Sequence, residues 1–381
     1  MRSALIVGAG IGGLAAAIAL RHADWEVQIV EQAATPRELG FALALAPNAL
    51  AALDELGLRH VVVPRGVEVK TLEVRRADGR LLKRIVMSGA AVQSVVLLRP
   101  ALHGALLEAV GPGVLQPGCR VTGVESGSSA AVVTADNQDL SRRTPADVVV
   151  GADGVGSVVR RALHPGEPPP RPSGYHALRG VSENVADRMG GADAVVYLGD
   201  GVEIGVARAS ASAVYWYISL LDGAVEADAA AALDRGLRGV HETPAGIIRA
   251  AAADAIRLDR LWLRAPLVTW GRGRVTLLGD AAHPVLPHTA QGAAQALEDA
   301  VALGLALRGG DIEAGLRRYE QVRAARTRRI IQSGPRIAAM TTTRSRARIA
   351  LRDSLVRLTP ARVLATTMTR LAADPHRALR G

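Results

Sequence analysis

The sequence has 381 residues, which exceeds one ordinary domain and indicates two domains with a further appendage. Apolar residues make up 49% and charged residues 22% of the chain, a globular balance that excludes a wholly disordered protein. No apolar run approaches the roughly 20 residues that cross a bilayer. The start lacks a secretory signal pattern, so we expect a cytoplasmic protein. The single cysteine, Cys119, excludes an internal disulfide and a cysteine-based metal site, and we expect no metal.

The net charge of +10 is concentrated near the end of the chain. Residues 315–381 contain 16 arginines against Glu320, Asp353 and Asp374, a local balance of +13, so the first 314 residues carry −3. From Arg323 onward this stretch has no aromatic residue, and we therefore do not expect nucleic-acid binding.

The first 31 residues predict a unit of strand, turn, helix and strand. Residues 4–7 are a short apolar run suited to a buried parallel strand, residues 14–22 predict a helix, and residues 27–30 predict a second strand that ends at Glu31. The turn fits Gly8-x-Gly10-x-x-Gly13, the spacing that binds dinucleotide phosphates at a helix N-terminus. Glu31 is placed to accept hydrogen bonds from ribose hydroxyls. This unit leaves FAD and NAD(P) open as the dinucleotide.

The rest of the chain predicts a mixture of helices and two kinds of sheet. We expect helices at residues 47–57, 100–110 and 291–307, buried strands at 147–151 and 274–278, and a hairpin at 67–74 and 81–86. A proline-rich stretch between His164 and Tyr175 predicts a linker. Strands at 175–181, 195–198, 203–208 and 214–220 then predict an antiparallel sheet in a second domain. The remainder is expected to be helical and rich in arginine.

A second segment with a ligand-binding pattern runs from Arg274 to Ala300. Asp280 follows a predicted strand, at the edge where α/β sheets bind ligands, and its carboxylate can hold a sugar or ribitol hydroxyl. The helix that begins near Gln291 offers amides and a positive dipole end, which suit the negative charge of a reduced flavin ring. Because a plain NAD dehydrogenase needs no such second device, we expect FAD as the cofactor.

These segments together resemble the single-component FAD-dependent monooxygenases of the p-hydroxybenzoate and salicylate hydroxylase type. The resemblance covers nearly the whole chain and rests on the glycine turn with Glu31, residues 40–58, Arg99 with Leu102 and Leu106, residues 151–160, and the Gly279-Asp280 segment. It implies an α/β fold with a Rossmann-like FAD-binding domain, an inserted antiparallel-sheet substrate domain and a C-terminal helical segment. The expected boundaries are residues 1–68, 96–167 and 266–335 for the FAD-binding domain, 69–95 and 168–265 for the substrate-binding domain, and 336–381 for the helical segment.

The resemblance also implies a set of cofactor-binding residues. Glu31 is expected to bind the adenosine ribose, Val121 the adenine region through its backbone, and Asp280 the ribitol chain. Arg99 and Arg37 are expected near the flavin, and Asp153 lies in a motif associated with both FAD and NAD(P)H. Ala293 and Ala294 offer backbone amides, although the family often has Asn in place of Ala294. The full set that we expect is Gly8, Gly10, Ile11, Gly12, Gly13, Glu31, Arg37, Arg99, Val121, Asp153, Asp280, Gly292, Ala293 and Ala294.

The substrate pocket is expected to take residues from the second domain and from the loop before residue 291. Arg179, Tyr217 and His288 are the pocket candidates, because alternation places Arg179 on the same strand face as Tyr175 and Tyr217 on the same face as Tyr215. Ordinary sheet packing is an equal alternative for the tyrosines, and His288 is either a pocket base or part of the loop. His283 is expected to be packed and hydrogen-bonded rather than catalytic.

The activity that the resemblance implies is hydroxylation. NAD(P)H reduces FAD, O2 adds to form a flavin C4a-hydroperoxide, and one oxygen atom passes to an aromatic, phenolic or polyketide-like molecule. The alternatives are an FAD oxidoreductase without oxygen transfer, and a degenerate flavoprotein that binds a partner through its basic tail. A monomer or homodimer that takes a small-molecule substrate and O2 is expected. Leu351, Leu355 and Leu358 leave membrane association open, although we favour a C-terminal helix packed on the FAD-binding domain with solvated arginines.

Overall fold

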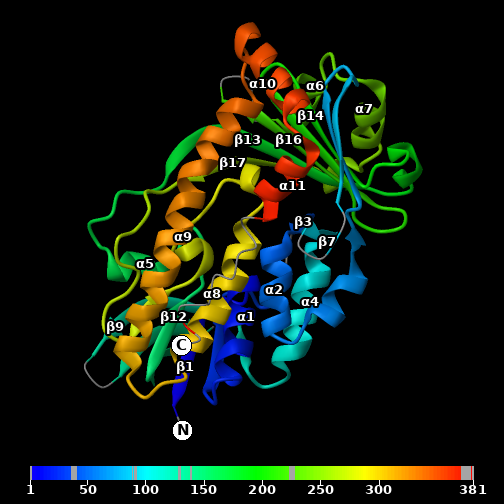
Figure 1. Cartoon of the computed structure of the whole chain (residues 1–381). Helices are drawn as coiled ribbons and strands as arrows, with labels where there is room; N and C mark the ends of the chain where they lie inside the picture. The colour runs from blue at the N-terminus through cyan, green and yellow to red at the C-terminus, as the bar shows by residue number, and fades with distance from the viewer. Residues whose placement is uncertain are drawn as a thin grey trace.

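The computed structural model describes residues 2–35, 41–87, 89, 92–127, 130–137, 140–222, 228–369 and 379. Figure 1 shows a parallel sheet with its helices at one end of the molecule and a larger sheet at the other. The long helix α9 (Ile312–Thr341) runs beside both ends. The mixed α/β architecture expected from the sequence is confirmed.

The parallel sheet has five strands within the described residues, in the order β18-β12-β1-β2-β8. Their bounds are β1 (Ser3–Val7), β2 (Glu26–Glu31), β8 (Leu115–Pro117), β12 (Val148–Gly151) and β18 (Val275–Leu277). Every pairing is parallel, and all of β12 is buried, which explains its uninterrupted apolar sequence. Helices α1 (Ile11–Arg21) and α8 (Gly292–Ala306) pack against each other beside this sheet. The strands and helices predicted here are confirmed, with α1 beginning three residues earlier than expected.

Smaller elements complete this end of the molecule. The helices are α2 (Pro47–Glu55), α3 (Arg59–Val62), η1 (Val63–Arg65), α4 (Arg99–Val110) and α5 (Val158–Leu163). One small sheet joins β3 (Ala42–Leu45), β7 (Val95–Leu98) and β4 (Val67–Glu68), and another joins β9 (Cys119–Ser126), β10 (Ala131–Asn137) and β11 (Leu140–Ala146). The β9–β11 sheet was not predicted; the outer half of β9 is exposed or half-buried, and β10 carries only a short apolar run.

The larger sheet has the order β17-β13-β16-β15-β14-β5-β6 in the described part of the chain. The strands are β5 (Thr71–Arg76), β6 (Leu81–Val86), β13 (Arg171–Ser182), β14 (Ala194–Leu198), β15 (Val202–Arg208), β16 (Val214–Leu221) and β17 (Arg257–Leu263). Helices α6 (Ala229–Gly236) and α7 (Glu242–Arg249) cover one face, where Trp216 and Ile218 pack with Ile247. The opposite face places Tyr175 and Ala177 against Leu286 and Ala338, and so it faces the parallel-sheet end of the molecule.

Three details of this sheet differ from the sequence predictions. The strands predicted between residues 175 and 220 pair antiparallel, as expected, but the sheet also includes β5, which pairs with β14 in parallel. The strand expected at residues 67–74 is divided into β4, which pairs with β7, and β5, which pairs with β6. The expected proline-rich linker is shorter, since β13 begins at Arg171 and tolerates Pro172 beside a register shift. The division of the chain into domains stays a prediction.

The arginine-rich part of the chain is helical as predicted between Ile312 and Thr369, apart from short breaks between its helices. It consists of α9, α10 (Arg346–Leu358) and α11 (Ala361–Thr369), while short 3-10 turns η3 (Ala186–Met189), η4 (Ala253–Ala255), η5 (Gly279–Ala281) and η6 (Pro287–Thr289) lie earlier in the chain. Helix α9 packs on α8, whereas α10 and α11 contact β6 at the edge of the larger sheet. We expected a C-terminal helix to pack on the FAD-binding domain. This is wrong for α10, which is tied to the larger sheet by the Asp353–Arg76 ion pair at 2.9 Å.

The apolar residues singled out on α10 are exposed. Leu351, Leu355 and Leu358 are 60%, 53% and 80% accessible. None of the helices in the described ranges is both long and apolar enough to cross a membrane.

Candidate functional site

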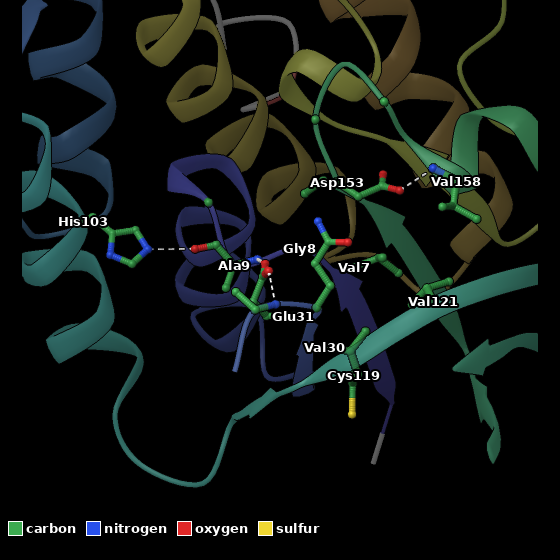
Figure 2. A pocket seen from close by; sticks show the side chains of 16 residues that line it. Val7, Gly8, Ala9, Val30, Glu31, His103, Cys119, Val121, Asp153 and Val158 are labelled. Atoms are coloured by element: carbon green, nitrogen blue, oxygen red, sulfur yellow. Dashed lines mark hydrogen bonds between the residues drawn. The ribbon is translucent and has the colours of Figure 1, made fainter. Parts of the chain in front are cut away.

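A cavity of about 310 Å³ lies where β1, β2 and β12 end. Figure 2 shows the side chains around it, which come from the glycine turn, the end of β2, helix α4, strand β9 and the turn after β12. The lining includes five residues that the sequence predicted for the cofactor, namely Gly8, Gly10, Glu31, Val121 and Asp153. The carboxyl edge of a parallel sheet thus gathers segments that are far apart in the chain.

Gly8 is required by the close approach of two backbones. Its φ is +104°, which is unfavourable for residues with a side chain, and a Cβ there would lie 2.6 Å from the carbonyl oxygen of Ala152. The turn after β1 therefore packs directly on the turn after β12, and the cavity opens between them. Ile11, Gly12 and Gly13 lie in α1, immediately after Gly10 at the N-cap.

Glu31 is held at the cavity by two backbone amides. Its carboxylate oxygens accept hydrogen bonds from the amide of Ala9 at 2.9 Å and from the amide of Ala33 at 2.8 Å. On the other side of the turn, the buried His103 on α4 donates through Nε2 to the Ala9 carbonyl at 2.8 Å. Figure 2 shows that Glu31 and His103 both bond to the backbone of Ala9. His103 was not among the predicted residues, although it lies next to Leu102 in one of the segments that carried the resemblance.

Asp153 presents an unsatisfied oxygen at the same cavity. One oxygen of its carboxyl group accepts a hydrogen bond from the amide of Val158 at 2.6 Å. The other, Oδ1, is buried and has no hydrogen-bond partner among the described residues. Burial raises the pKa of Asp153, although the amides of Val158 and Val159, which both donate to Oδ2, oppose the shift. A nucleotide fits this cavity. Its hydroxyl groups can donate to the free oxygen of Asp153, and its phosphate chain can approach the backbone closely at Gly8.

The second predicted ligand-binding segment is tied to the first by Arg160. This buried side chain donates from its NH1 nitrogen to the carbonyls of Ala281 and Ala282, at 2.9 and 3.0 Å, and forms an ion pair with Glu167. Asp280 lies in η5 with an exposed side chain, directly before these carbonyls. Residues 151–160 and the Gly279-Asp280 segment, which both carried the resemblance, are therefore held together by direct hydrogen bonds.

A buried ionic network lies under the start of α8. Asp299 accepts hydrogen bonds from the Gly279 amide at 2.9 Å, from Arg323 at 2.6 Å and from His283 at 2.5 Å. Glu298 pairs with Arg323 and Arg326 and accepts a hydrogen bond from Asn48 at 2.6 Å. Burial raises the pKa of each acid, but the facing cations outweigh it and lower both values. His283 is thus packed and hydrogen-bonded, as expected, while the sequence analysis missed the remainder of the network.

The start of α8 is the part of the predicted flavin site that this network positions. Gly292 and Ala293 lie in the first turn and are half-buried, and Ala294 is buried. Arg99 is the first residue of α4 and lines a second cavity, of about 450 Å³, together with Arg179 and Tyr215. Arg37 lies outside the described residues.

The three substrate-pocket candidates lie on or against one face of the larger sheet. Arg179 and Tyr217 are directly paired across β13 and β16, and Arg179 forms an ion pair with Asp259 on β17. His288 reaches this face from η6, where a hydrogen bond of 2.7 Å joins its Nε2 to the hydroxyl of Ser219. Its ring also stands edge-on to Tyr175, with centroids 5.3 Å apart. Arg179, Tyr217 and His288 thus approach the same part of the fold.

Two further polar residues on this face were missed by the sequence analysis. The hydroxyl of Tyr217 donates to the buried Glu203 on β15 at 2.6 Å, and Ser219 lies directly across from Glu203. Burial and the neighbouring Glu203 raise the pKa of Tyr217 well above its usual value. Burial lowers the pKa of His288, and the Glu203 charge opposes that shift. An acid followed directly by the apolar run at residues 204–207 was the signal in the sequence for Glu203.

The sequence matches known flavoproteins over most of its length. The model of the family described as FAD binding domain matches residues 1–334. The aurachin C monooxygenase/isomerase of Stigmatella aurantiaca is 32% identical over 342 residues, which cover 87% of this chain and 88% of that protein. The 3-hydroxybenzoate 6-hydroxylase 1 of Aquipseudomonas alcaligenes is 33% identical over 354 residues, which cover 86% of each.

Solved structures show the same fold. The structure of Klebsiella pneumoniae HpxO with FAD and uric acid superposes with a TM-score of 0.90 at 24% identity, and the match covers 97% of this chain and 96% of that one. A salicylate hydroxylase substrate complex superposes with a TM-score of 0.78 at 22% identity, and the match covers 98% of each chain.

Proposed function

Because the chain belongs to the family of single-component FAD-dependent monooxygenases of the p-hydroxybenzoate hydroxylase type, we propose that it consumes NAD(P)H and O2 to oxygenate an aromatic, phenolic or polyketide-like molecule. When bound and reduced by NAD(P)H, FAD would activate O2, of which one oxygen atom enters the substrate and the other leaves as water. The protein binds and orients FAD and the substrate, and it excludes water from the site.

The adenosine end of FAD is assigned to the cavity shown in Figure 2. Glu31, held by two amides, accepts from the ribose, the glycine turn receives the phosphates, and the free oxygen of Asp153 accepts a further donor of the cofactor. Val121 lies at the cavity wall and is assigned to the adenine region. The ribitol chain is assigned to Asp280 and the flavin ring to the amides at the start of α8.

The observation that carries the proposal is the contact between η6 and the larger sheet. His288 lies four positions before Gly292, where α8 begins, and it is bonded to Ser219 on β16. The segment assigned to the flavin ring is therefore adjacent to a sheet face with tyrosine, arginine and carboxyl groups. This arrangement suits a substrate held between the sheet and the flavin, since a positioned substrate makes oxygen transfer efficient.

Isotope labelling tests the proposal against the two alternatives. Phenolic and nitrogen-heterocyclic compounds are screened for stimulation of NAD(P)H oxidation by the FAD-loaded protein, and products formed under ¹⁸O2 are analysed by mass spectrometry. We expect slow oxidation without substrate, marked stimulation by a suitable compound, and one labelled oxygen atom in its product. Product formation without label would support a simple oxidoreductase, and FAD binding without any turnover would support a degenerate flavoprotein.

A further inference from the structure

Glu203 has an unused hydrogen-bonding oxygen on the sheet face that meets η6. Its residue is only 4% exposed, and one oxygen, Oε1, accepts from the Tyr217 hydroxyl at 2.6 Å. The other oxygen, Oε2, is buried and makes no hydrogen bond to any residue that the structure describes. Burying a carboxyl oxygen without a partner is costly, so such an atom calls for a ligand.

The position of this carboxyl group is fixed by its neighbours. Gly205, two residues along the strand, makes room for the ring of Tyr217, since a Cβ at residue 205 would lie 2.0 Å from the Cε1 atom of that ring. The ring crosses over Gly205, and its hydroxyl reaches Glu203. The unused oxygen is therefore held in place rather than free to turn away.

A second unsatisfied atom lies beside it. Ser219 is the cross-strand neighbour of Glu203, and its hydroxyl is bonded to Nε2 of His288. The other ring nitrogen of His288, Nδ1, is buried and likewise makes no hydrogen bond within the described ranges. The Glu203 charge also acts on the pKa of His288, which is consistent with their closeness. Two groups at the junction of sheet and η6 thus lack partners.

We propose that Glu203 is a specificity-determining residue, whose free oxygen accepts a hydrogen bond from a ring N–H or hydroxyl group of the substrate. This rests on the proposed function and defines one end of its substrate. An anionic group at this end is disfavoured, because it would face a carboxylate at close range in a poorly solvated site. A carboxylate elsewhere on the ring is compatible with the site, since Arg179 lies at a different position along the face, beside Tyr215 at the second cavity.

The test compares compounds that differ only in the donor. 4-Quinolone is paired with N-methyl-4-quinolone, and 3-hydroxybenzoate with 3-methoxybenzoate. Each is titrated into the FAD-loaded protein without NAD(P)H, and binding is read from the flavin absorbance spectrum. We expect the donor-bearing member of at least one pair to bind at least tenfold more tightly than its methylated partner. Glu203→Gln should reduce that preference to less than threefold while FAD content is unchanged.

The matched control is Glu183→Gln, which removes an exposed carboxylate next to β13 and should keep the full preference. Equal affinities within both pairs, including no measurable binding, would overturn the inference, as would a preference that survives Glu203→Gln. The ¹⁸O2 experiment is read separately. Labelled product with a Glu203-independent preference rejects only this inference, whereas a Glu203-dependent preference without labelled product rejects only the monooxygenase proposal.

Discussion

The carboxylate of Asp299 accepts a hydrogen bond from the backbone amide of Gly279 at a distance of 2.9 Å. Gly279 begins the turn that carries Asp280, and Asp299 lies within α8, whose N-terminus is assigned to the flavin ring. The same carboxylate is bound to Arg323 on α9. One buried acid therefore holds together the turn assigned to the ribitol chain and the helix assigned to the flavin ring, and α9 supports both through Arg323.

Replacing this acid should weaken both the fold and cofactor binding. Asp299→Asn keeps the shape of the side chain but leaves Arg323 with less compensating charge, and breaking a buried ion pair costs about 3–5 kcal/mol. We expect a comparable loss in the free energy of unfolding, measured with urea, and a lower ratio of FAD to protein. Asp54→Asn is the control, because Asp54 is 53% exposed in its ion pair with Arg59. Wild-type stability and FAD content in Asp299→Asn would contradict the assigned role.

The same network predicts how stability depends on acid. Burial raises the pKa of Asp299, but His283 and Arg323 outweigh it, so the value in the folded protein lies below the usual one. A depressed pKa contributes stability that is complete above the unfolded value, about 3.9 for aspartate, and is lost as the pH falls. The difference in Tm between the wild type and Asp299→Asn should therefore be largest near neutrality and shrink below about pH 4. A difference that stays constant from pH 7 to pH 3 would contradict this linkage.

Arg160 and Arg161 offer a comparison of neighbouring arginines. Arg160 is fully buried and bonded to the carbonyls of Ala281 and Ala282, whereas Arg161 is exposed. Arg160→Met should leave Glu167 with Arg264 as its remaining ion-pair partner and loosen the Asp280 turn, with a loss of about 3 kcal/mol in stability, the lower end of the range for a broken buried ion pair, and faster FAD release. Arg161→Met should change stability by less than about 1 kcal/mol. Thermal unfolding measures the change in stability, and stopped-flow recording of the flavin fluorescence that appears on release measures the rate of FAD loss. Equal behaviour of the two variants would show that Arg160 does not tie its own segment to the Asp280 turn.

Glu31 should control FAD affinity more than stability. Its carboxylate is oriented by the amides of Ala9 and Ala33, and a charge-assisted hydrogen bond to the ribose is worth about 1.5–3 kcal/mol. Glu31→Ala is therefore expected to raise the Kd for FAD by roughly 10- to 100-fold in titrations of the apoprotein. Glu26→Ala, at the exposed start of the same strand, provides the control. An unchanged Kd would remove Glu31 from the adenosine site.

The FAD-binding end was predictable because its chemistry is local in the sequence. The glycine turn, Glu31 and the segment around Asp280 are each defined by residues that lie within a few positions of one another. Parallel strands also meet at one edge, so their ends could be placed together without a structure. Whether those residues bind FAD as assigned stays a prediction that the variants above test.

The larger sheet and the buried network depend on contacts between distant residues. Glu203 and Tyr217 are joined across neighbouring strands, and Asp299 and Arg323 across two helices, with no short pattern to reveal either pair. The order of the sheet also inserts β5 beside β14, a parallel pairing that joins segments more than one hundred positions apart. Periodicity predicts a strand but not its partner, and this explains both the missed residues and the unpredicted pairing of β5 with β14.

The buried ring of His288 gives a second, separable pH dependence. Burial lowers the pKa of His288 in the folded protein, while the unfolded chain should titrate near the ordinary value of about 6.5. The unfolded state then binds a proton before the folded state does, so stability falls as the pH drops through about 6.5 and toward the folded pKa. His288→Gln can keep a hydrogen bond to Ser219 but cannot titrate, and its Tm should fall less steeply between about pH 7 and pH 5 than that of the wild type. His60→Gln, at an exposed position, should follow the wild-type profile.

Since the Glu203 charge opposes the shift, Glu203→Gln should lower the His288 pKa further and steepen the loss of stability on acidification. Parallel profiles for the wild type, His288→Gln and Glu203→Gln would show that His288 is not buried as a neutral group next to Glu203.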